Sequence, residues 1–210
     1  MTMRDYKYYI FDQGNVILDI NPQLSLDAFA NLIDPAKSGL VSAKDLLGGG
    51  DNKFITDFML GHISTDQFVD YLMPVMKQGV LREQVVSAWD ALILDVPEQR
   101  KKALLKLRGL GKKTYMLSNT NDEHMRHIIG KCFAGDRSKL ECYFDGLFLS
   151  NEMHLAKPSS EIFIEMMNQS GINPSEAIFI DDLQQHLDAA AALGFDTLLS
   201  TGDYWLTRLF

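Results

Sequence analysis

The stretch YYIFDQGNV, residues 8–16, decides the fold of this chain. Its first half is a strand-like apolar run that ends at one carboxylate, Asp12, and the chain breaks two residues later at Gly14. Such an arrangement puts a single acid at the carboxyl edge of a sheet, where open α/β folds bind their ligands. A second acid two residues after Asp12 is missing, because Gly14 stands there. Both features bear on function.

Four later apolar runs have the same length and similar flanks as residues 7–11. Together they predict five buried strands, the other four at residues 113–117, 146–149, 177–180 and 196–199. Amphipathic helical stretches lie between the later runs, at residues 122–132, 159–170 and 183–193. Alternating strands and helices predict a Rossmann-like α/β fold, a doubly wound parallel sheet with helices on both faces.

The connection between the first two strands is much longer than the others. Later strands recur about every 30 residues, as in β-α-β units, but roughly 100 residues separate the first strand from the second, and an unstructured loop of that length is improbable. We therefore predict an inserted helical unit. Its predicted helices are residues 22–33, 54–60, 65–76, 81–94 and 98–108, with a glycine-rich turn at residues 48–52.

These lengths divide the chain into a core domain, residues 1–19 and 110–210, and an α-helical cap domain, residues 20–109. The cap would emerge beside the strand that carries Asp12, so we expect it to lie over the carboxyl edge of the sheet. Aromatic residues recur in the insertion at helical spacings, and packing between helices explains most of them better than substrate contact does. They are Phe54, Phe58, Phe68, Tyr71 and Trp89.

Composition narrows the partners. With 46% hydrophobic and 23% charged residues in 210, the chain has an ordinary globular balance. The net charge of −8 argues against nucleic acid or an anionic membrane as partner. It leaves room for a small anionic substrate, because a bound cation can reverse the local field. Neither a signal peptide nor a membrane span is predicted, and Cys132 and Cys142 suit reduced thiols in the cytoplasm. We expect a monomer or a weak homodimer.

Polar groups follow the predicted strands where each strand ends. They are Asp12, the pair Ser118-Asn119, Lys157 and the pair Asp181-Asp182. The lysine and the hydroxyl can hold phosphoryl oxygens, and carboxylates are the hard ligands that magnesium prefers. Bare carboxylates repel phosphate, so Asp12 could attack one only if a cation and Lys157 offset its charge. The sequence predicts a phosphate and cation site at this edge.

In combination, four motifs resemble the haloacid dehalogenase-like (HAD) hydrolase superfamily over essentially the whole chain. They are FDQGNVILDI (residues 11–20), MLSNTN (116–121), HLAKPSSEIF (154–163) and IFIDD (178–182). The first is similar to a subgroup of sugar-phosphate phosphatases, including bacterial α-glucose-1-phosphate phosphatases, that carry Gly-Asn-Val here. The resemblance implies a magnesium-dependent phosphatase with a small helical cap, acting on a small phosphorylated metabolite such as a sugar phosphate.

The resemblance also implies a role for each acid. Asp12 would be the nucleophile and form an aspartyl-phosphate that water then hydrolyses. Asp12, the backbone carbonyl of Gly14 and Asp182 would bind magnesium. Asp181 would help through water or by orienting Lys157.

The phosphate-binding residues implied by the resemblance are Ser118, the backbone at Asn119, and Lys157, which would balance the negative charge. His186 is a departure, because related sequences often have Asn or Asp there, and we expect it to be a helix-face residue without a catalytic role. The other histidines show no metal-ligand spacing, and we expect them to be structural or exposed. They are His62, His124, His127 and His154.

Gly14 is the second departure, because most phosphatases of this family carry an acid there that protonates the leaving group. Such help is worth about 10²–10⁴-fold in rate. The glycine predicts slow turnover, or leaving groups that need little protonation, such as anomeric or acyl phosphates, unless a cap residue or a water substitutes. Three alternatives stay open: a catalytically weak metabolite-binding or interaction protein, a dehalogenase-type hydrolase without magnesium, and a phosphotransferase that isomerises its substrate.

Overall fold

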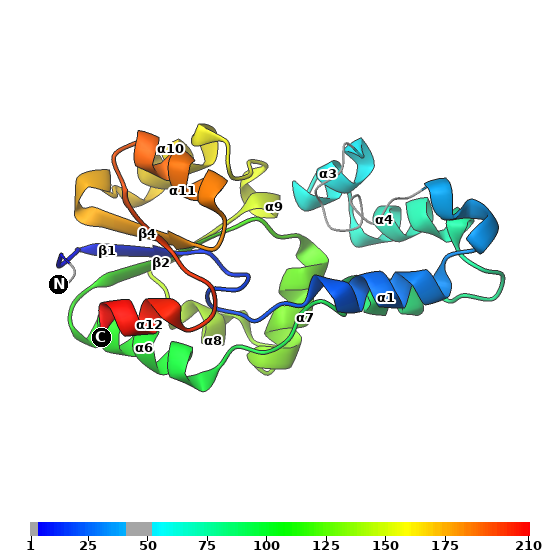
Figure 1. Ribbon diagram of the computed structural model, residues 1–210, viewed down its shortest axis with the longest axis horizontal. Coiled ribbons are helices and arrows are strands. Elements are labelled where there is room, and N and C mark those ends of the chain that lie inside the picture. Colours follow the sequence, from blue (N-terminus) through cyan, green and yellow to red (C-terminus); the bar gives the residue numbers. More distant parts are fainter. Residues whose placement is uncertain (1–3, 41–51) are drawn as a thin grey trace.

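A five-stranded parallel sheet forms the centre of the computed structural model, which describes residues 4–40 and 52–210 (Figure 1). The strands are β1 (Tyr8–Phe11), β2 (Lys113–Ser118), β3 (Gly146–Leu149), β4 (Ala177–Asp181) and β5 (Asp196–Leu199). Their order in the sheet is β3-β2-β1-β4-β5, and every neighbouring pair is parallel. The predicted strands are confirmed to within one residue. The order places β1 in the middle, between β2 and β4.

Helices cover both faces of the sheet, as a doubly wound fold requires (Figure 1). After β2 come α7 (Asp122–Cys132), α8 (Arg137–Glu141), α9 (Ser150–Met153), α10 (Ser160–Ser170), η3 (Pro174–Glu176), α11 (Gln184–Ala192) and α12 (Tyr204–Leu209). The three predicted helices in this half correspond to α7, α10 and α11. The sequence did not predict α8, α9 and α12, which have at most six residues each and are too short for a clear 3.6-residue period.

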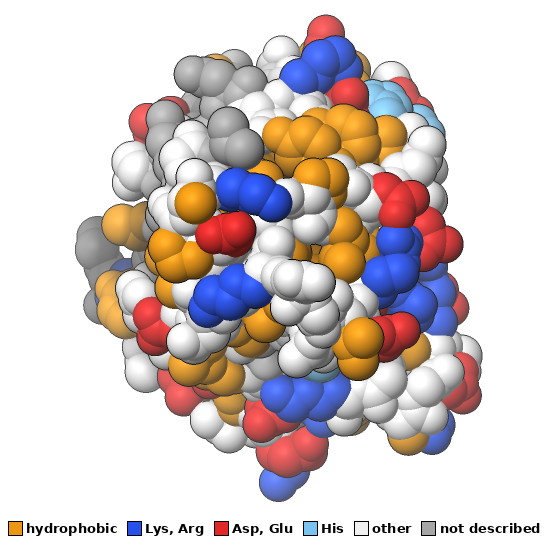
Figure 2. All heavy atoms as spheres, turned by 90° about the vertical axis from the view of Figure 1, so that its right-hand side faces the viewer, with side chains coloured by type: hydrophobic (Ala, Val, Ile, Leu, Met, Phe, Trp, Pro, Cys, Tyr) orange, Lys and Arg blue, Asp and Glu red, His pale blue; other side chains and the backbone are white. Residues whose placement is uncertain are grey.

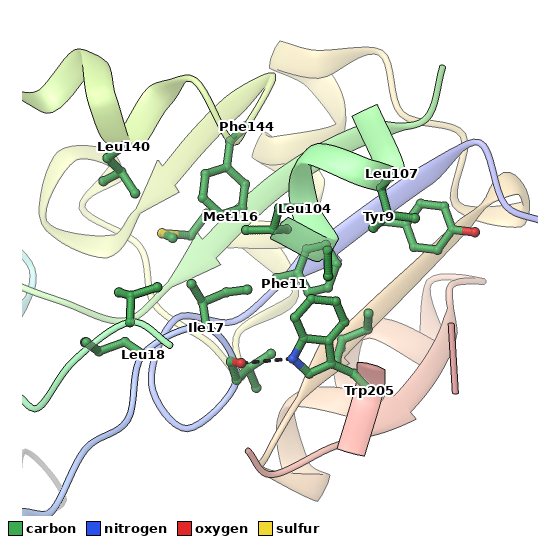
Figure 3. Close-up of a cluster of buried hydrophobic side chains, with 14 of the residues drawn as sticks. Tyr9, Phe11, Ile17, Leu18, Leu104, Leu107, Met116, Leu140, Phe144 and Trp205 are labelled. Carbon is green, nitrogen blue, oxygen red and sulfur yellow. Dashed lines mark hydrogen bonds between the residues drawn. The ribbon is translucent and has the colours of Figure 1, made fainter. Parts of the chain in front are cut away.

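The alternation of side chains along β1 builds two separate cores. Tyr9 and Phe11 face one side of the sheet and join a cluster with residues of α6, α7 and α12 (Figure 3). Tyr8 and Ile10 face the other side and pack with residues of α10 and α11. This period of two fixes β1 rigidly, since a slip by one residue would exchange the two faces. The acid that follows β1 is therefore held at a defined place.

The helices between β1 and β2 form a third cluster of their own. They are α1 (Pro22–Leu32), η1 (Pro35–Leu40), α3 (Lys53–Met59), α4 (Thr65–Leu72), η2 (Met73–Val75), α5 (Arg82–Asp90) and α6 (Glu98–Gly109). The rings of Phe58 and Phe68 stack with centroids 4.2 Å apart, and Trp89 packs against Phe68 at 4.6 Å. These aromatic residues pack between helices, as expected. The predicted glycine-rich turn lies outside the described residues except for Asn52, which caps α3.

Two predicted helices of the insertion are shorter than expected. The helix predicted over residues 65–76 becomes a 3₁₀ turn at Met73, where Pro74 has no N–H to continue the α-helical ladder. The helix predicted over residues 81–94 ends at Asp90. Its last residues are extended instead, because Ile93 forms an antiparallel bridge with Ile20.

Two extended linkers connect the insertion to the sheet, and they pair with each other. Asp19 N donates to Asp95 O at 3.0 Å, Leu94 N to Asp19 O at 3.0 Å, and Asn21 N to Leu92 O at 2.8 Å. Beyond them, α6 packs on the sheet, where Leu104 joins the cluster of Phe11. Among the described residues, no helix is long and apolar enough to cross a membrane.

Candidate active site

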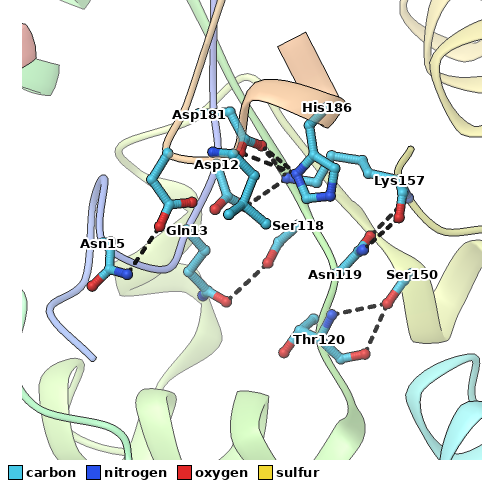
Figure 4. Close-up of polar contacts among 12 residues, drawn as sticks. Asp12, Gln13, Asn15, Ser118, Asn119, Thr120, Ser150, Lys157, Asp181 and His186 are labelled. Atoms are coloured by element: carbon cyan, nitrogen blue, oxygen red, sulfur yellow. Dashed lines mark hydrogen bonds and ion pairs between the residues drawn. The ribbon is translucent and has the colours of Figure 1, made fainter. Parts of the chain in front are cut away.

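A buried ion-pair triad lies at the carboxyl edge of the sheet, with Lys157 at its centre (Figure 4). Lys157 Nζ is 2.7 Å from Asp12 Oδ1 and 2.7 Å from Asp181 Oδ2. The lysine side chain is 0% exposed and that of Asp181 is also 0% exposed. Asp12 directly follows β1, Asp181 ends β4, and Lys157 comes from the loop before α10. The fold thus brings together three residues that lie up to 169 positions apart (12 to 181).

Asn119 holds the main chain of Lys157 on both sides. Its Nδ2 donates to Lys157 O at 2.8 Å, and its Oδ1 accepts from Lys157 N at 2.9 Å. Since this uses the whole carboxamide, only the backbone of Asn119 can serve a ligand. The side chain of Asn119 is therefore a support for the lysine.

Burial and charge act against each other in this triad. Burial is the largest influence on Asp12 and raises its pKa to about 6, although Lys157 opposes the shift. Burial also works against charge on Asp181, but hydrogen bonds from His186 and Lys157 outweigh it and lower the pKa of Asp181. For Lys157, burial favours the neutral amine, yet its two carboxylate partners raise the pKa overall. The lysine is the cation that keeps the carboxylates together.

A third carboxylate completes a cluster that fits a divalent cation. Asp12, Asp181 and Asp182 each offer one oxygen, and these oxygens all lie within 4.8 Å of one another. Three acids so close repel one another unless a cation shares them. Oxygen ligands of this kind are the ones that magnesium prefers. The predicted site residues are therefore close together in space.

Two residues that contact these acids were not predicted as site residues. Asn15 Nδ2 donates to Asp182 Oδ2 at 2.9 Å, and His186 Nδ1 lies 3.0 Å from Asp181 Oδ1. His186 is 5% exposed, so the expectation of a helix-face residue without a role misses this contact. The position of His186 in the first turn of α11, five residues after Asp181, was the only signal in the sequence.

Ser118 is close to the triad but its hydroxyl is already engaged. Ser118 Oγ donates to Gln13 Oε1 at 3.2 Å (Figure 4). The adjacent cavity of about 640 Å³ is lined, as far as the described residues form it, by Asn119 but not by Ser118. A phosphoryl group would therefore need Ser118 to turn away from Gln13, a contact that the sequence did not reveal.

The cavity lies between the sheet edge and the insertion. Its wall on the sheet side includes Asp12, Lys157, Asp182 and His186. The insertion side contributes Ile20, Thr56, Met59 and Leu60. A small molecule in this cavity would touch the carboxylate cluster at one end and a mostly apolar surface at the other.

The strand order and the lysine–carboxylate cluster define an α/β protein of the hydrolase type that the four motifs resemble. The chain belongs to the haloacid dehalogenase-like hydrolase family, whose model matches residues 6–194. This confirms the resemblance stated from the sequence.

Two bacterial sources supply close relatives. The D-ribitol-5-phosphate phosphatase of Bacteroides thetaiotaomicron is 31% identical over 192 residues, which cover 91% of this chain and 90% of the relative. A HAD family enzyme from the same organism, solved in complex with magnesium and inorganic phosphate, is 30% identical with a TM-score of 0.84, over 98% of this chain and 100% of that one. A predicted HAD-like family hydrolase from Porphyromonas gingivalis is 26% identical, with a TM-score of 0.79 and 98% of each chain covered.

Proposed function

We propose that this chain is a magnesium-dependent phosphatase that hydrolyses a small phosphorylated metabolite, most simply a sugar phosphate, through an aspartyl-phosphate on Asp12. The observation that carries the proposal is the buried contact of Lys157 with both Asp12 and Asp181 at 2.7 Å. Burying a lysine and two acids is costly in free energy and is typical of sites that do chemistry. The relative that acts on D-ribitol 5-phosphate supports a sugar-phosphate substrate.

The metal-binding residues in this proposal are Asp12, Asp182 and the carbonyl of Gly14, with Asp181 acting through water or through Lys157. Their fit rests on the three carboxylate oxygens within 4.8 Å of one another. The magnesium in the related enzyme supports the choice of cation. When bound, the cation would neutralise charge on the phosphoryl group and on the acids.

The chain's own residues have separate tasks. Asp12 attacks phosphorus with one carboxylate oxygen, and Lys157 offsets the charge of both Asp12 and the phosphoryl group. The backbone at Asn119, with Ser118 once its hydroxyl is released from Gln13, donates to phosphoryl oxygens. The task of Asn119's side chain is to hold Lys157 in place.

The insertion acts as a cap in this proposal. We keep the predicted core (1–19 and 110–210) and cap (20–109) with one change, since α6 packs on the sheet and is grouped with the core. The outer face of the insertion mixes Lys and Arg side chains with Asp and Glu (Figure 2), which suits a small metabolite better than a polyanion. The cytoplasmic location and the monomeric or weakly dimeric state stay predictions.

A panel of phosphate esters, assayed with magnesium and with a chelator, tests the proposal. We expect phosphate release that requires magnesium and that falls at least about 10³-fold in Asp12→Asn, since the amide cannot serve as the nucleophile. Asp188→Asn, on the exposed side of α11, is the matched control and should keep wild-type rates. Release that survives Asp12→Asn would refute the assignment.

The second candidate function is a metabolite-binding protein with little turnover. The observation that favours it is Gly14, where the family's usual acid is missing. Tight binding of a phosphorylated metabolite without release of phosphate from any ester would support this candidate. A dehalogenase-type hydrolase is less consistent with the acids, because three carboxylates beside the nucleophile are unfavourable without a cation.

A further inference from the structure

We propose that Ile20 takes the place of the missing leaving-group acid, so that this enzyme acts on phosphate esters of acidic hydroxyls or carboxyls, whose leaving oxygen departs without a proton from the protein. Anomeric, enol, aryl and acyl phosphates belong to this class. The inference rests on the proposed phosphatase function and specifies its substrate. It starts from the space beside Gly14.

That space is filled by the side chain of Ile20. A Cβ atom added at Gly14 would lie 3.2 Å from Ile20 Cδ1 and 3.9 Å from Ile20 Cγ1. A contact of 3.2 Å is tighter than carbon atoms normally make, since their optimal separation is about 3.5–4.0 Å. The direction in which an acid would leave Gly14 therefore ends at a methyl group.

The backbone on both sides of Ile20 prevents an easy retreat. Ile20 pairs with Ile93 in an antiparallel bridge, and the neighbouring Asp19 and Asn21 bond to the opposite linker through their backbone N–H groups. The side chain also packs against the core cluster of Phe11. Ile20 is thus part of the hinge and of the cavity wall at once.

The cavity offers the leaving group no other acid from the insertion. Among the residues that the structure describes, the insertion side of the wall consists of Ile20, Met59, Leu60 and one hydroxyl, Thr56. Thr56 Oγ1 donates to Asn52 O at 3.2 Å, and an aliphatic hydroxyl is a very weak acid. The titratable groups of the lining come from the opposite side, where the nucleophile lies. The leaving group therefore meets a mostly apolar surface.

The chemistry that follows balances without a protein acid. An oxygen of Asp12 forms a bond to phosphorus while the bond from phosphorus to the leaving oxygen breaks, and its electron pair stays on that oxygen. The oxygen takes a proton from water after departure. Water then attacks the phosphoryl group, the bond from phosphorus to Asp12 breaks, and the second proton goes to solvent. Because the first step leaves an anion, its rate depends strongly on leaving-group acidity.

A series of substituted phenyl phosphates, whose phenols differ in pKa, measures this dependence. With magnesium present, we expect kcat/KM of the wild type to fall steeply as the phenol becomes a weaker acid. Simple alkyl phosphates, including a sugar-alcohol phosphate such as D-ribitol 5-phosphate, should be the poorest substrates. A shallow dependence in the wild type would overturn the inference, and this measurement needs no variant.

Variants at the two positions separate the acid from the space. In the double variant Gly14→Asp with Ile20→Val, we expect the dependence to flatten, with the poorest leaving groups gaining at least about 10²-fold. Gly14→Asp alone should gain less, because Ile20 crowds the new side chain. Ile20→Val alone should keep the steep slope. The control Gly14→Asn with Ile20→Val has the same shape without a proton, and equal rates in the two double variants would contradict the inference.

The outcome also distinguishes this inference from the proposed function. If magnesium and Asp12 are required but the slope is shallow, the inference alone fails. If no ester releases phosphate, both fail together. A steep slope that Gly14→Asp with Ile20→Val flattens supports both.

Discussion

At the scale of single residues, the contacts around each acid are what make the site. Asp182 is the metal-binding acid in our proposal that the lysine does not contact, and its orientation depends on Asn15. Asn15 has a φ of +55°, a left-handed conformation that asparagine tolerates better than most residues. Its backbone oxygen also accepts from Gly202 N at 2.6 Å. Asn15 is therefore held from both sides while it donates to the acid.

This arrangement predicts the effect of Asn15→Gly. Glycine accepts the same φ, so the fold should persist while the hydrogen bond to Asp182 is lost. Partners that orient metal ligands typically contribute 10–100-fold to affinity. We expect the magnesium concentration for half-maximal phosphate release to rise by about 10-fold. An unchanged magnesium requirement in a metal titration would contradict this role of Asn15.

Much of the site could be predicted because each reactive residue follows a strand. Asp12, Lys157 and Asp181 were expected together since carboxyl ends of parallel strands meet at one edge. The roles of Asn15, His186 and Ile20 could not be predicted in this way. Their contacts depend on how a loop, a helix turn and a linker return to that edge, which no local pattern in the sequence specifies.

At the scale of elements, the insertion contacts the sheet side through the turn between α3 and α4. His154 Nδ1 lies 2.7 Å from Leu60 O, and Ser150 Oγ donates to Met59 O at 3.0 Å. Gly61 follows in the same turn, with a φ of +70°. A Cβ atom added at Gly61 would lie only 2.1 Å from Asn151 O. A glycine is required there by the close approach as well as by the φ.

Two glycines with similar backbones test that contact. Gly61→Ala and Gly79→Ala both place alanine at a positive φ, which costs about 1–2 kcal/mol. Gly79 has no atom within 4 Å of an added Cβ, so its substitution measures that strain alone. We expect Gly61→Ala to lower the free energy of unfolding by at least about 1 kcal/mol more, since the turn must also move from α9. Equal losses in urea titrations would show that the contact is weak.

The contact between α5 and α7 adds a dependence of stability on pH. Asp90 is 5% exposed, and its Oδ2 lies 3.2 Å from His127 Nδ1. Its Oδ1 has no hydrogen-bond partner among the described residues. Burial raises the pKa of Asp90 from 3.8 to about 7. The folded state thus favours the protonated acid.

The sign of the effect follows from linkage. A raised pKa contributes stability that is fully present below about pH 4 and is lost as pH rises through about 7. Asp90→Asn lacks this loss, so its melting temperature relative to wild type should increase between pH 4 and pH 8. The gain at pH 8 should be on the order of a few kcal/mol. Asp70→Asn, at an exposed site, is the control, and a difference independent of pH would contradict the account.

Element boundaries in the insertion were harder to predict than those of the sheet. The strands have five buried runs with clear ends, whereas apolar spacing alone extended α5 through Ile93. That residue is apolar because it pairs with Ile20 and faces the core, not because it continues a helix. Apolar residues at helical spacing cannot by themselves distinguish these two environments.

At the scale of the whole molecule, magnesium should stabilise the fold, since the three acids are close together only in the folded chain. Binding at 100 times the dissociation constant contributes about 2.7 kcal/mol. For a chain of this size we expect the melting temperature to rise by about 5–10 °C with saturating magnesium. Asp182→Asn should lose most of this rise and Asp188→Asn none of it. An equal rise in both variants would place the cation elsewhere.

The account's central claim is that Asp12 carries the phosphoryl group during turnover. Acid quenching during turnover of the best ester in the panel, followed by mass spectrometry of the peptide that contains residues 8–16, tests it most directly. We predict a phosphoryl group on Asp12 that appears only with magnesium and substrate and is absent from Asp12→Asn. Magnesium-dependent phosphate release at the wild-type rate from Asp12→Asn, with no phosphoryl group on that peptide, would contradict the claim.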